Sequence, residues 1–203
     1  MIKRVISALL AVLSVSALVL GLILSHQQRV LADKLIRLHV VANSDSEEDQ
    51  RMKLRVRDAV LRCTDSVFDN KPENPKAALQ AALPEIEMEA NRCLRREGSL
   101  HRAEVTLKEE LFPTREYINF SLPAGKYTAL RVTIGDGRGQ NWWCVVFPSL
   151  CMCASVEEFS DAAQTAGFTD GEVHLITENS DGYVLKFRLI EIFEKIREIF
   201  SGE

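Results

Sequence analysis

The stretch DKLIRLHVVANSDSEEDQ, residues 33–50, predicts a strand that leads directly into a helix. Its first half alternates, so that apolar Leu38 and polar His39 fall on opposite faces of the strand. Its second half is typical of a helix start, because Ser44 and Glu47 have the spacing of a capping box. The acidic residues around them also suit the positive end of the helix dipole. The stretch therefore predicts that a strand and an amphipathic helix are adjacent in the fold.

Two amphipathic helices are predicted to follow this strand, the first ending near Phe68 and the second at Gly98. Asn74 and Pro75 predict the start of the second helix, as an N-cap followed by a proline in the first turn. Pro84 is expected to kink or split that helix. We expect the two helices to form a hairpin that lies on a sheet. Their apolar positions keep helical spacing, with Met52, Val56, Ala59, Val60, Cys63 and Val67 in the first helix, and Leu79, Ala82, Leu83, Ile86, Ala90, Cys93 and Leu94 in the second.

The hydrophobic period changes to two from His101 onward. The runs HRAEVTLKEE, YINFSL, KYTALRVTIG and NWWCVVF are each typical of a strand, and together they predict an antiparallel meander. The run GEVHLIT is expected to add a strand, and YVLKFRLIEIFEKIREIF to form an amphipathic C-terminal helix. The predicted fold class is α+β, a mainly antiparallel sheet with a helical hairpin and a C-terminal helix packed on it.

The N-terminus predicts a membrane segment ahead of this domain. Residues 5–24 carry no charge, follow Lys3 and Arg4, and are about long enough for a helix to cross a bilayer core. The two basic residues favour a cytoplasmic N-terminus, and the lack of a clear cleavage site favours an anchor over a cleaved signal. We expect residues 1–32 to be the anchor or signal segment and residues 33–203 to be an extracytoplasmic domain.

Charge and glycine spacing exclude two classes of ligand. The chain has 203 residues and a formal net charge of -4, so no basic excess is present to neutralise a nucleic-acid backbone. The glycines of IGDGRGQ lack both the GxGxxG and the P-loop spacing. Asp136 and Gly137 instead predict a hairpin turn between two strands. We therefore expect no nucleic-acid partner, no cofactor and no small-molecule substrate.

Three cysteines lie in the run QNWWCVVFPSLCMC, residues 140–153. They lack the C-x-x-C spacing of a zinc site and no histidine is near them, so no metal site is expected. A disulfide is the natural use of cysteines in an oxidising compartment, and Cys144 and Cys151 could close a loop around Pro148. Cys153 could take the place of Cys151. Cys63 and Cys93, on the apolar stripes of the helices, are better explained as small buried hydrophobes.

The alternative is that Cys144 is a catalytic nucleophile, with His39, His101 or His174 as its base. Its apolar strand raises the pKa of a thiol instead of lowering it, which favours a buried structural residue.

Trp142 and Trp143 are adjacent on one strand, so their side chains must lie on opposite faces. One is expected to join the core. The other, beside a flexible glycine turn, is a candidate hot spot for a protein partner, although burial under the C-terminal helix explains it equally well. The other candidate partner contacts are His39, Asn43 and Gly137.

Three stretches in this order resemble the stage II sporulation protein R family of endospore-forming bacteria: IRLHVVANSDSEEDQRMKLRVRDAVL, PTREYINFSLPAGKYTALRVTIGDGRGQNWWCVVFPSLC and VLKFRLIEIFEKI. The resemblance covers nearly the whole chain, and NWWCVVFP and HVVANSDS are its most specific runs. It implies a protein that is exported from the forespore to the intermembrane space. There it would activate a membrane-embedded aspartic protease of the mother cell, which processes the precursor of sigma factor E.

The resemblance implies a signalling ligand instead of an enzyme, and it supplies no catalytic residue. Two other classes stay open. One is an exported thiol hydrolase that uses Cys144. The other is a structural protein of the cell wall or membrane, which would need repeats or aromatic sugar-binding clusters that the sequence lacks.

Overall fold

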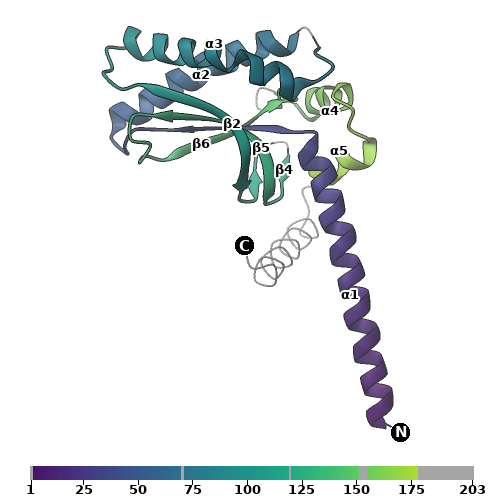
Figure 1. The fold of residues 1–203 in the computed structure, drawn as a ribbon. Coiled ribbons are helices and arrows are strands. Elements are labelled where there is room, and N and C mark those ends of the chain that lie inside the picture. The colour runs from purple at the N-terminus through teal and green to yellow at the C-terminus, as the bar shows by residue number, and fades with distance from the viewer. Residues whose placement is uncertain (1, 70, 119, 151–154, 178–203) are drawn as a thin grey trace.

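The structure is a computed structural model that describes residues 2–69, 71–118, 120–150 and 155–177. A helical hairpin covers one face of a sheet, shorter elements cover part of the other face, and a long N-terminal helix projects away from both (Figure 1). The elements in chain order are α1 (Ile2–Asp33), β1 (Ile36–Val41), α2 (Glu47–Asp69), α3 (Pro75–Arg96), β2 (Ala103–Phe112), β3 (Arg115–Glu116), β4 (Ser121–Leu122), β5 (Gly125–Ile134), β6 (Asn141–Phe147), α4 (Val156–Thr165) and α5 (Asp170–Thr177).

The main sheet has four strands in the order β2-β5-β1-β6. β1 runs parallel to β5 and antiparallel to β6, while β2 and β5 are antiparallel. The predicted antiparallel meander is therefore wrong, because β1 separates β5 from β6 and makes the sheet mixed. All six residues of β1 are buried, as a strand covered on both faces requires. The α+β class and the helical hairpin are as predicted.

Residues 135–140 do not form the predicted hairpin turn at Asp136 and Gly137. They cross the end of β1, where the amides of Arg138 and Gly139 donate to backbone carbonyls just after that strand at 3.1 and 2.9 Å. A Cβ on Gly139 would lie 2.2 Å from a backbone carbonyl oxygen. The glycines therefore allow residues 135–140 to pass close to the backbone that follows β1. The spacing of glycines in the sequence does not distinguish this arrangement from a hairpin turn.

α2 and α3 pack on the sheet through the apolar stripes that the sequence predicts. Asn74 is the N-cap of α3, since its Oδ1 accepts from the Ala77 amide at 3.0 Å. Pro84 does not split α3, which continues to Arg96. The buried side chains on this face of the sheet are Ile36, Leu38, Val40, Val56, Val60, Leu61, Leu79, Ile86, Ala90, Leu94, Ala103, Val105, Leu130, Val132, Ile134, Cys144 and Val146.

The N-cap of α2 is Ser46, two residues later than predicted. The Asp49 amide donates to Ser46 Oγ at 3.2 Å. Ser44 Oγ donates instead to a carboxylate oxygen of Asp49 at 2.5 Å. Ser44 therefore fixes the approach to the helix, while Ser46 satisfies its first turn.

The run GEVHLIT belongs to helix α5, so the predicted strand is wrong. Thr169 and Glu172 form a reciprocal capping box, in which each backbone amide donates to the other side chain, at 2.7 and 3.3 Å. α4 and α5 cover part of the sheet face opposite the hairpin, together with the end of α1 and the β3–β4 arm (residues 113–124). The predicted C-terminal helix, residues 183–200, lies outside the described residues.

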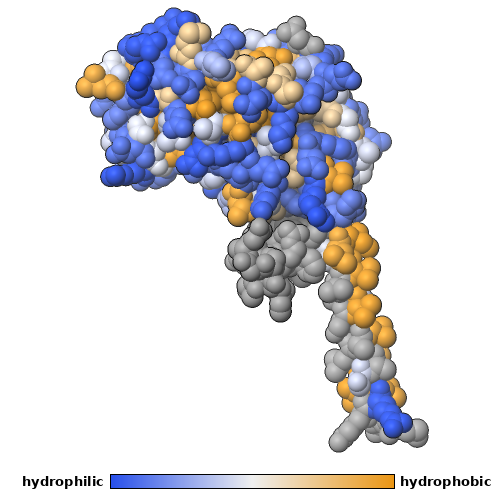
Figure 2. Space-filling view, viewed as in Figure 1, coloured by the Kyte–Doolittle hydropathy of each residue, from blue (hydrophilic) through white to orange (hydrophobic). Residues whose placement is uncertain are grey.

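α1 extends away from the domain, and apolar side chains are exposed along it (Figure 2). Its last turn packs on the domain through Leu31 and Ala32, which are buried. No helix in the described part of the chain combines the length and apolar character needed to cross a membrane. The predicted crossing by residues 5–24 therefore stays a prediction. The exposed apolar side chains of α1 are Val5, Ile6, Leu9, Val12, Val15, Val19, Leu22, Ile23 and Val30.

Candidate functional site

His39 and Trp143 come together on the sheet face that points away from α2 and α3. The two residues are partners in the β1–β6 register. Their rings stack with centroids 4.9 Å apart and planes 15° apart. His39 is only 3% exposed, whereas Trp143 is half-buried. A partner that approaches this face would therefore reach the tryptophan before the histidine.

Trp142 lies on the other face of the sheet, as adjacent strand residues must. It packs against the core under the helical hairpin, and the Arg57 guanidinium lies 4.7 Å from its ring centroid. Both tryptophans are half-buried, so the expected division into one core and one surface tryptophan is not what the structure shows.

Asn43 and Gly137 have structural roles at the crossover. Asn43 Oδ1 accepts from the Asp136 amide at 3.0 Å, and its Nδ2 donates to Asp49 at 2.9 Å. Gly137 has a φ of 62°, and a Cβ there would lie 2.5 Å from a methyl carbon of Thr133. Both residues hold segment 135–140 over the end of β1 and lie apart from the His39–Trp143 pair.

Three further residues join His39 and Trp143, and we call the five together the aromatic cluster: Arg37, His39, Phe112, Tyr127 and Trp143. Phe112 lies in its centre, with ring centroids 5.5 Å from His39, 5.1 Å from Trp143 and 5.8 Å from Tyr127. The Arg37 guanidinium lies 4.1 Å from the centroid of Phe112 and 4.8 Å from that of Tyr127. The cluster combines side chains from all four strands of the main sheet.

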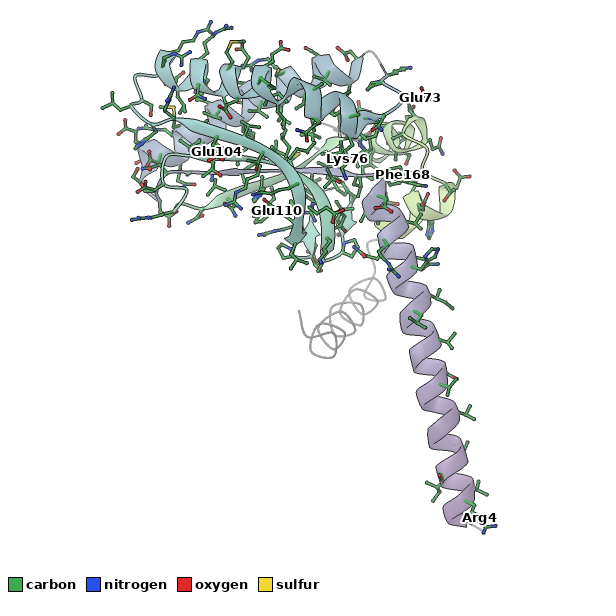
Figure 3. The ribbon with its side chains drawn as sticks, viewed as in Figure 1. Arg4, Glu73, Lys76, Glu104, Glu110 and Phe168 are labelled. Carbon is green, nitrogen blue, oxygen red and sulfur yellow. The ribbon has the colours of Figure 1, made fainter. Side chains whose placement is uncertain are left out.

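Glu110 of β2 lies on the same side of the sheet as this cluster (Figure 3). One of its oxygens lies 2.7 Å from His39 Nε2 and 3.6 Å from an Arg131 nitrogen. Burial lowers the pKa of His39 below its usual value; the Glu110 charge opposes this shift and Arg131 reinforces it. The imidazole is therefore neutral at neutral pH.

Tyr127 is also held in its neutral form. Burial raises the pKa of its hydroxyl to about 12. That hydroxyl donates to the Pro123 carbonyl at 2.6 Å. At neutral pH the Tyr127 hydroxyl therefore stays protonated and acts as a hydrogen-bond donor.

Cys144 is fully buried, with 0% exposure, and is disulfide-bonded. Cys63 and Cys93 carry free thiols whose pKa values are raised, chiefly by burial. Cys151 lies outside the described residues, so its pairing with Cys144 stays a prediction. Cys144 faces the helical hairpin while His39 faces the other side of the sheet, so His39 cannot serve as its base.

The structure adds residues that sequence reasoning did not select. Arg37, Phe112 and Glu110 share one face of the sheet only because β1, β5 and β2 pair in a particular register. One signal was present: Arg37 and His39 are polar residues on one face of a strand that is otherwise apolar. Within the described residues, no group of three His, Cys, Asp or Glu side chains is placed to hold a metal ion.

The site as a whole is a half-buried tryptophan that packs over a buried cluster of aromatic and cationic side chains. Comparison with known proteins then gives the family. The family described as Stage II sporulation protein R matches residues 32–157. The chain is 35% identical over 195 residues to Stage II sporulation protein R of Bacillus subtilis (strain 168), with 87% of this chain and 86% of that protein covered.

The chain therefore belongs to the stage II sporulation protein R family. The matched region begins in the last turn of α1 and includes all six strands, so the aromatic cluster lies inside it. No solved structure matches the chain.

Proposed function

We propose that the chain is an exported signalling protein of sporulation that activates a membrane-bound aspartic protease, which then processes the precursor of sigma factor E. The observation that carries this proposal is membership of the stage II sporulation protein R family across the whole sheet. The chain acts in this proposal by binding, and the protease supplies the catalytic groups.

The state of Cys144 supports a binding role over the thiol hydrolase. A nucleophilic cysteine must be an accessible thiolate beside a base. Cys144 is buried and disulfide-bonded, and the sheet separates it from His39. The raised pKa values of Cys63 and Cys93 also oppose thiolate formation at neutral pH.

Export to the space between the forespore and mother-cell membranes is the second part of the proposal. The exposed apolar side chains of α1 support it, because such a surface is unfavourable in water and favourable in a bilayer. In this arrangement residues 5–24 meet the membrane and residues 33–203 lie outside the cytoplasm of the cell that makes them.

The contact surface in this proposal is the rim of the aromatic cluster, where Trp143, Arg115 and Tyr117 are half-buried. The Arg115 guanidinium lies 5.0 Å from the Trp143 ring centroid. Tryptophan and arginine are the side chains most often found at the energetic centre of protein interfaces. The β3–β4 arm carries Arg115 and Tyr117, so it forms one wall of this surface.

Co-expression of the chain, the protease and the sigma-factor precursor in a non-sporulating host tests the proposal. We expect precursor processing only when all three are present, and none when the protease is catalytically inactivated. Processing that persists with the inactivated protease would assign the cleavage to this chain. A wild-type chain that adds nothing to the protease would contradict the activator role.

A further inference from the structure

Buried polar atoms without hydrogen-bond partners gather on one face of the sheet. Within the described residues they include Arg37 Nε and Nη1, Thr106 Oγ1 and Arg115 Nε. Arg37 and Thr106 point away from the helical hairpin, and Arg115 lies over Trp143 on the same side. A buried polar group without a partner is unfavourable, so its retention requires a reason.

Arg37 is the most unusual of these residues because it is a fully buried cation, with 0% exposure. Its Nη2 donates to the Tyr117 hydroxyl at 3.0 Å, and its guanidinium contacts the rings of Phe112 and Tyr127. No carboxylate of the described residues pairs with it. Cation–π contacts offset only part of the loss of hydration that burial imposes on an arginine.

Among the residues that the structure describes, the nearby charges do not supply an anion for Arg37. Glu110 is already shared between His39 and Arg131. Arg115 adds a second guanidinium to this side of the sheet, 5.0 Å from the Trp143 ring centroid, while Arg37 lies over Phe112 and Tyr127. Lys108, exposed on the same face of β2, adds further positive charge along the approach to it.

We propose that Arg37 and Arg115 form a binding site for a carboxylate that a protein partner presents, entering between Trp143 and the β3–β4 arm. Arginine donors form charge-assisted hydrogen bonds with carboxylates and phosphates alike. In an aromatic, water-poor setting a singly charged carboxylate loses less hydration on entry than a more highly charged phosphate, which favours the carboxylate. The half-buried rim formed by Trp143, Arg115 and Tyr117 suits an inserted acidic side chain or chain end. The statement that a protein supplies the carboxylate rests on the proposed function. The preference of the site for a carboxylate rests on the contacts of Arg37 and Arg115 alone.

The carboxylate preference is tested by NMR titration of the full-length chain in detergent. The chain has two tryptophans, and Trp142 on the opposite face serves as an internal control. A blocked peptide containing glutamate should shift the Trp143 indole signal and leave that of Trp142 in place. Its glutamine counterpart and inorganic phosphate, at matched ionic strength, should bind about tenfold more weakly or not at all. Equal binding of the glutamine peptide or of phosphate would overturn the carboxylate assignment.

Arg37→Met tests the residue itself, because it keeps a long, unbranched apolar side chain and removes the guanidinium and its charge. We expect a thermal midpoint equal to or above that of wild type, with binding of the glutamate peptide and sigma-factor processing each reduced at least about tenfold. Arg115→Met, at a half-buried position, should also reduce peptide binding and sigma-factor processing. It decides the question if Arg37→Met does not fold. Arg51→Met is the control, since the Arg51 side chain is 71% exposed.

The outcomes separate this site from the proposed function. If folded Arg37→Met and Arg115→Met bind the peptide and activate the protease like wild type, the site is wrong and the activator role stands. If wild type fails to activate the protease, the activator role is wrong, and the peptide titration still decides whether the carboxylate site exists.

Discussion

Trp143 of β6 stacks on His39 of β1, and this contact joins the half-buried rim of the cluster to its interior. His39 in turn reaches Glu110 of β2 at 2.7 Å. His39 therefore links Trp143 on one edge strand of the sheet to Glu110 on the other edge strand. The pair thus connects a proposed contact surface with the stability of the fold.

Replacing each tryptophan by alanine should have different consequences. Trp143→Ala removes the half-buried ring of the proposed interface, so we expect a loss of about 2 kcal/mol in partner binding, roughly thirtyfold in affinity. Trp142→Ala removes a ring that packs under the hairpin, so it should chiefly lower the melting temperature. The affinity for the partner and the melting temperature must be measured for both variants. Normal signalling by Trp143→Ala, with signalling lost in a fully stable Trp142→Ala, would place the contact on the hairpin side.

The buried, neutral His39 should make stability depend on pH in a known direction. Its pKa in the folded chain is lowered from 6.5, so the unfolded chain binds a proton first as the pH falls. Stability should therefore be fully retained above 6.5 and decrease from there down to the lowered pKa. Urea unfolding of wild type and His39→Gln at about pH 7.5 and about pH 5.5 measures this contribution. An equal pH dependence in the two proteins would show that His39 does not contribute.

Gly139→Ala should disturb the crossover of segment 135–140 over β1. The new Cβ would lie 2.2 Å from the Ser44 carbonyl oxygen, so the backbone must move, with an expected loss of roughly 2 kcal/mol or more in unfolding free energy. Gly171→Ala is the matched control, because Gly171 lies within α5 and nothing would lie within 4 Å of its Cβ. That control should be neutral or gain up to about 1 kcal/mol of helix stability. A Gly139→Ala protein as stable as this control would argue against the crossover geometry.

Cys144→Ala separates a structural cysteine from a catalytic one. Loss of the disulfide should lower stability by about 2–4 kcal/mol. The fraction that stays folded should still support sigma-factor processing, because the buried Cys144 side chain takes no part in the proposed binding surface. Cys93→Ala, which removes a free thiol, is the control for lost packing alone. A folded Cys144→Ala protein that cannot support processing would return the thiol hydrolase as the better hypothesis.

The sequence predicts the elements of this fold better than their arrangement, because periodicity is local and strand pairing is not. The run NWWCVVF became β6 with unchanged bounds, and the apolar stripes of α2 and α3 became the core. The placement of β1 between β5 and β6 depends on contacts between distant segments, which alternation does not encode. The predicted strand at GEVHLIT was wrong for a different reason. The capping box of Thr169 and Glu172 starts a helix there, and it outweighs the short alternating run.

The candidate site was predictable in part. Trp143 and His39 were both selected, but their direct contact follows from the β1–β6 register. Arg37 was not selected, because no sequence pattern shows that Tyr127 of β5 and Tyr117 of the β3–β4 arm pack against it. Asn43 and Gly137 were selected as partner contacts, and the structure explains them through the crossover.

Photo-crosslinking at two exposed positions tests most directly whether the rim of the aromatic cluster contacts the protease. Ile118, in the β3–β4 arm beside the rim, is 93% exposed, and Leu100, just before the other end of β2, is 99% exposed. A photoreactive residue at either position should therefore leave the fold intact. The two positions flank opposite ends of β2, whose ten residues span roughly 30 Å. The account predicts a crosslink to the protease from position 118 and none from position 100; a crosslink from position 100 alone would contradict it.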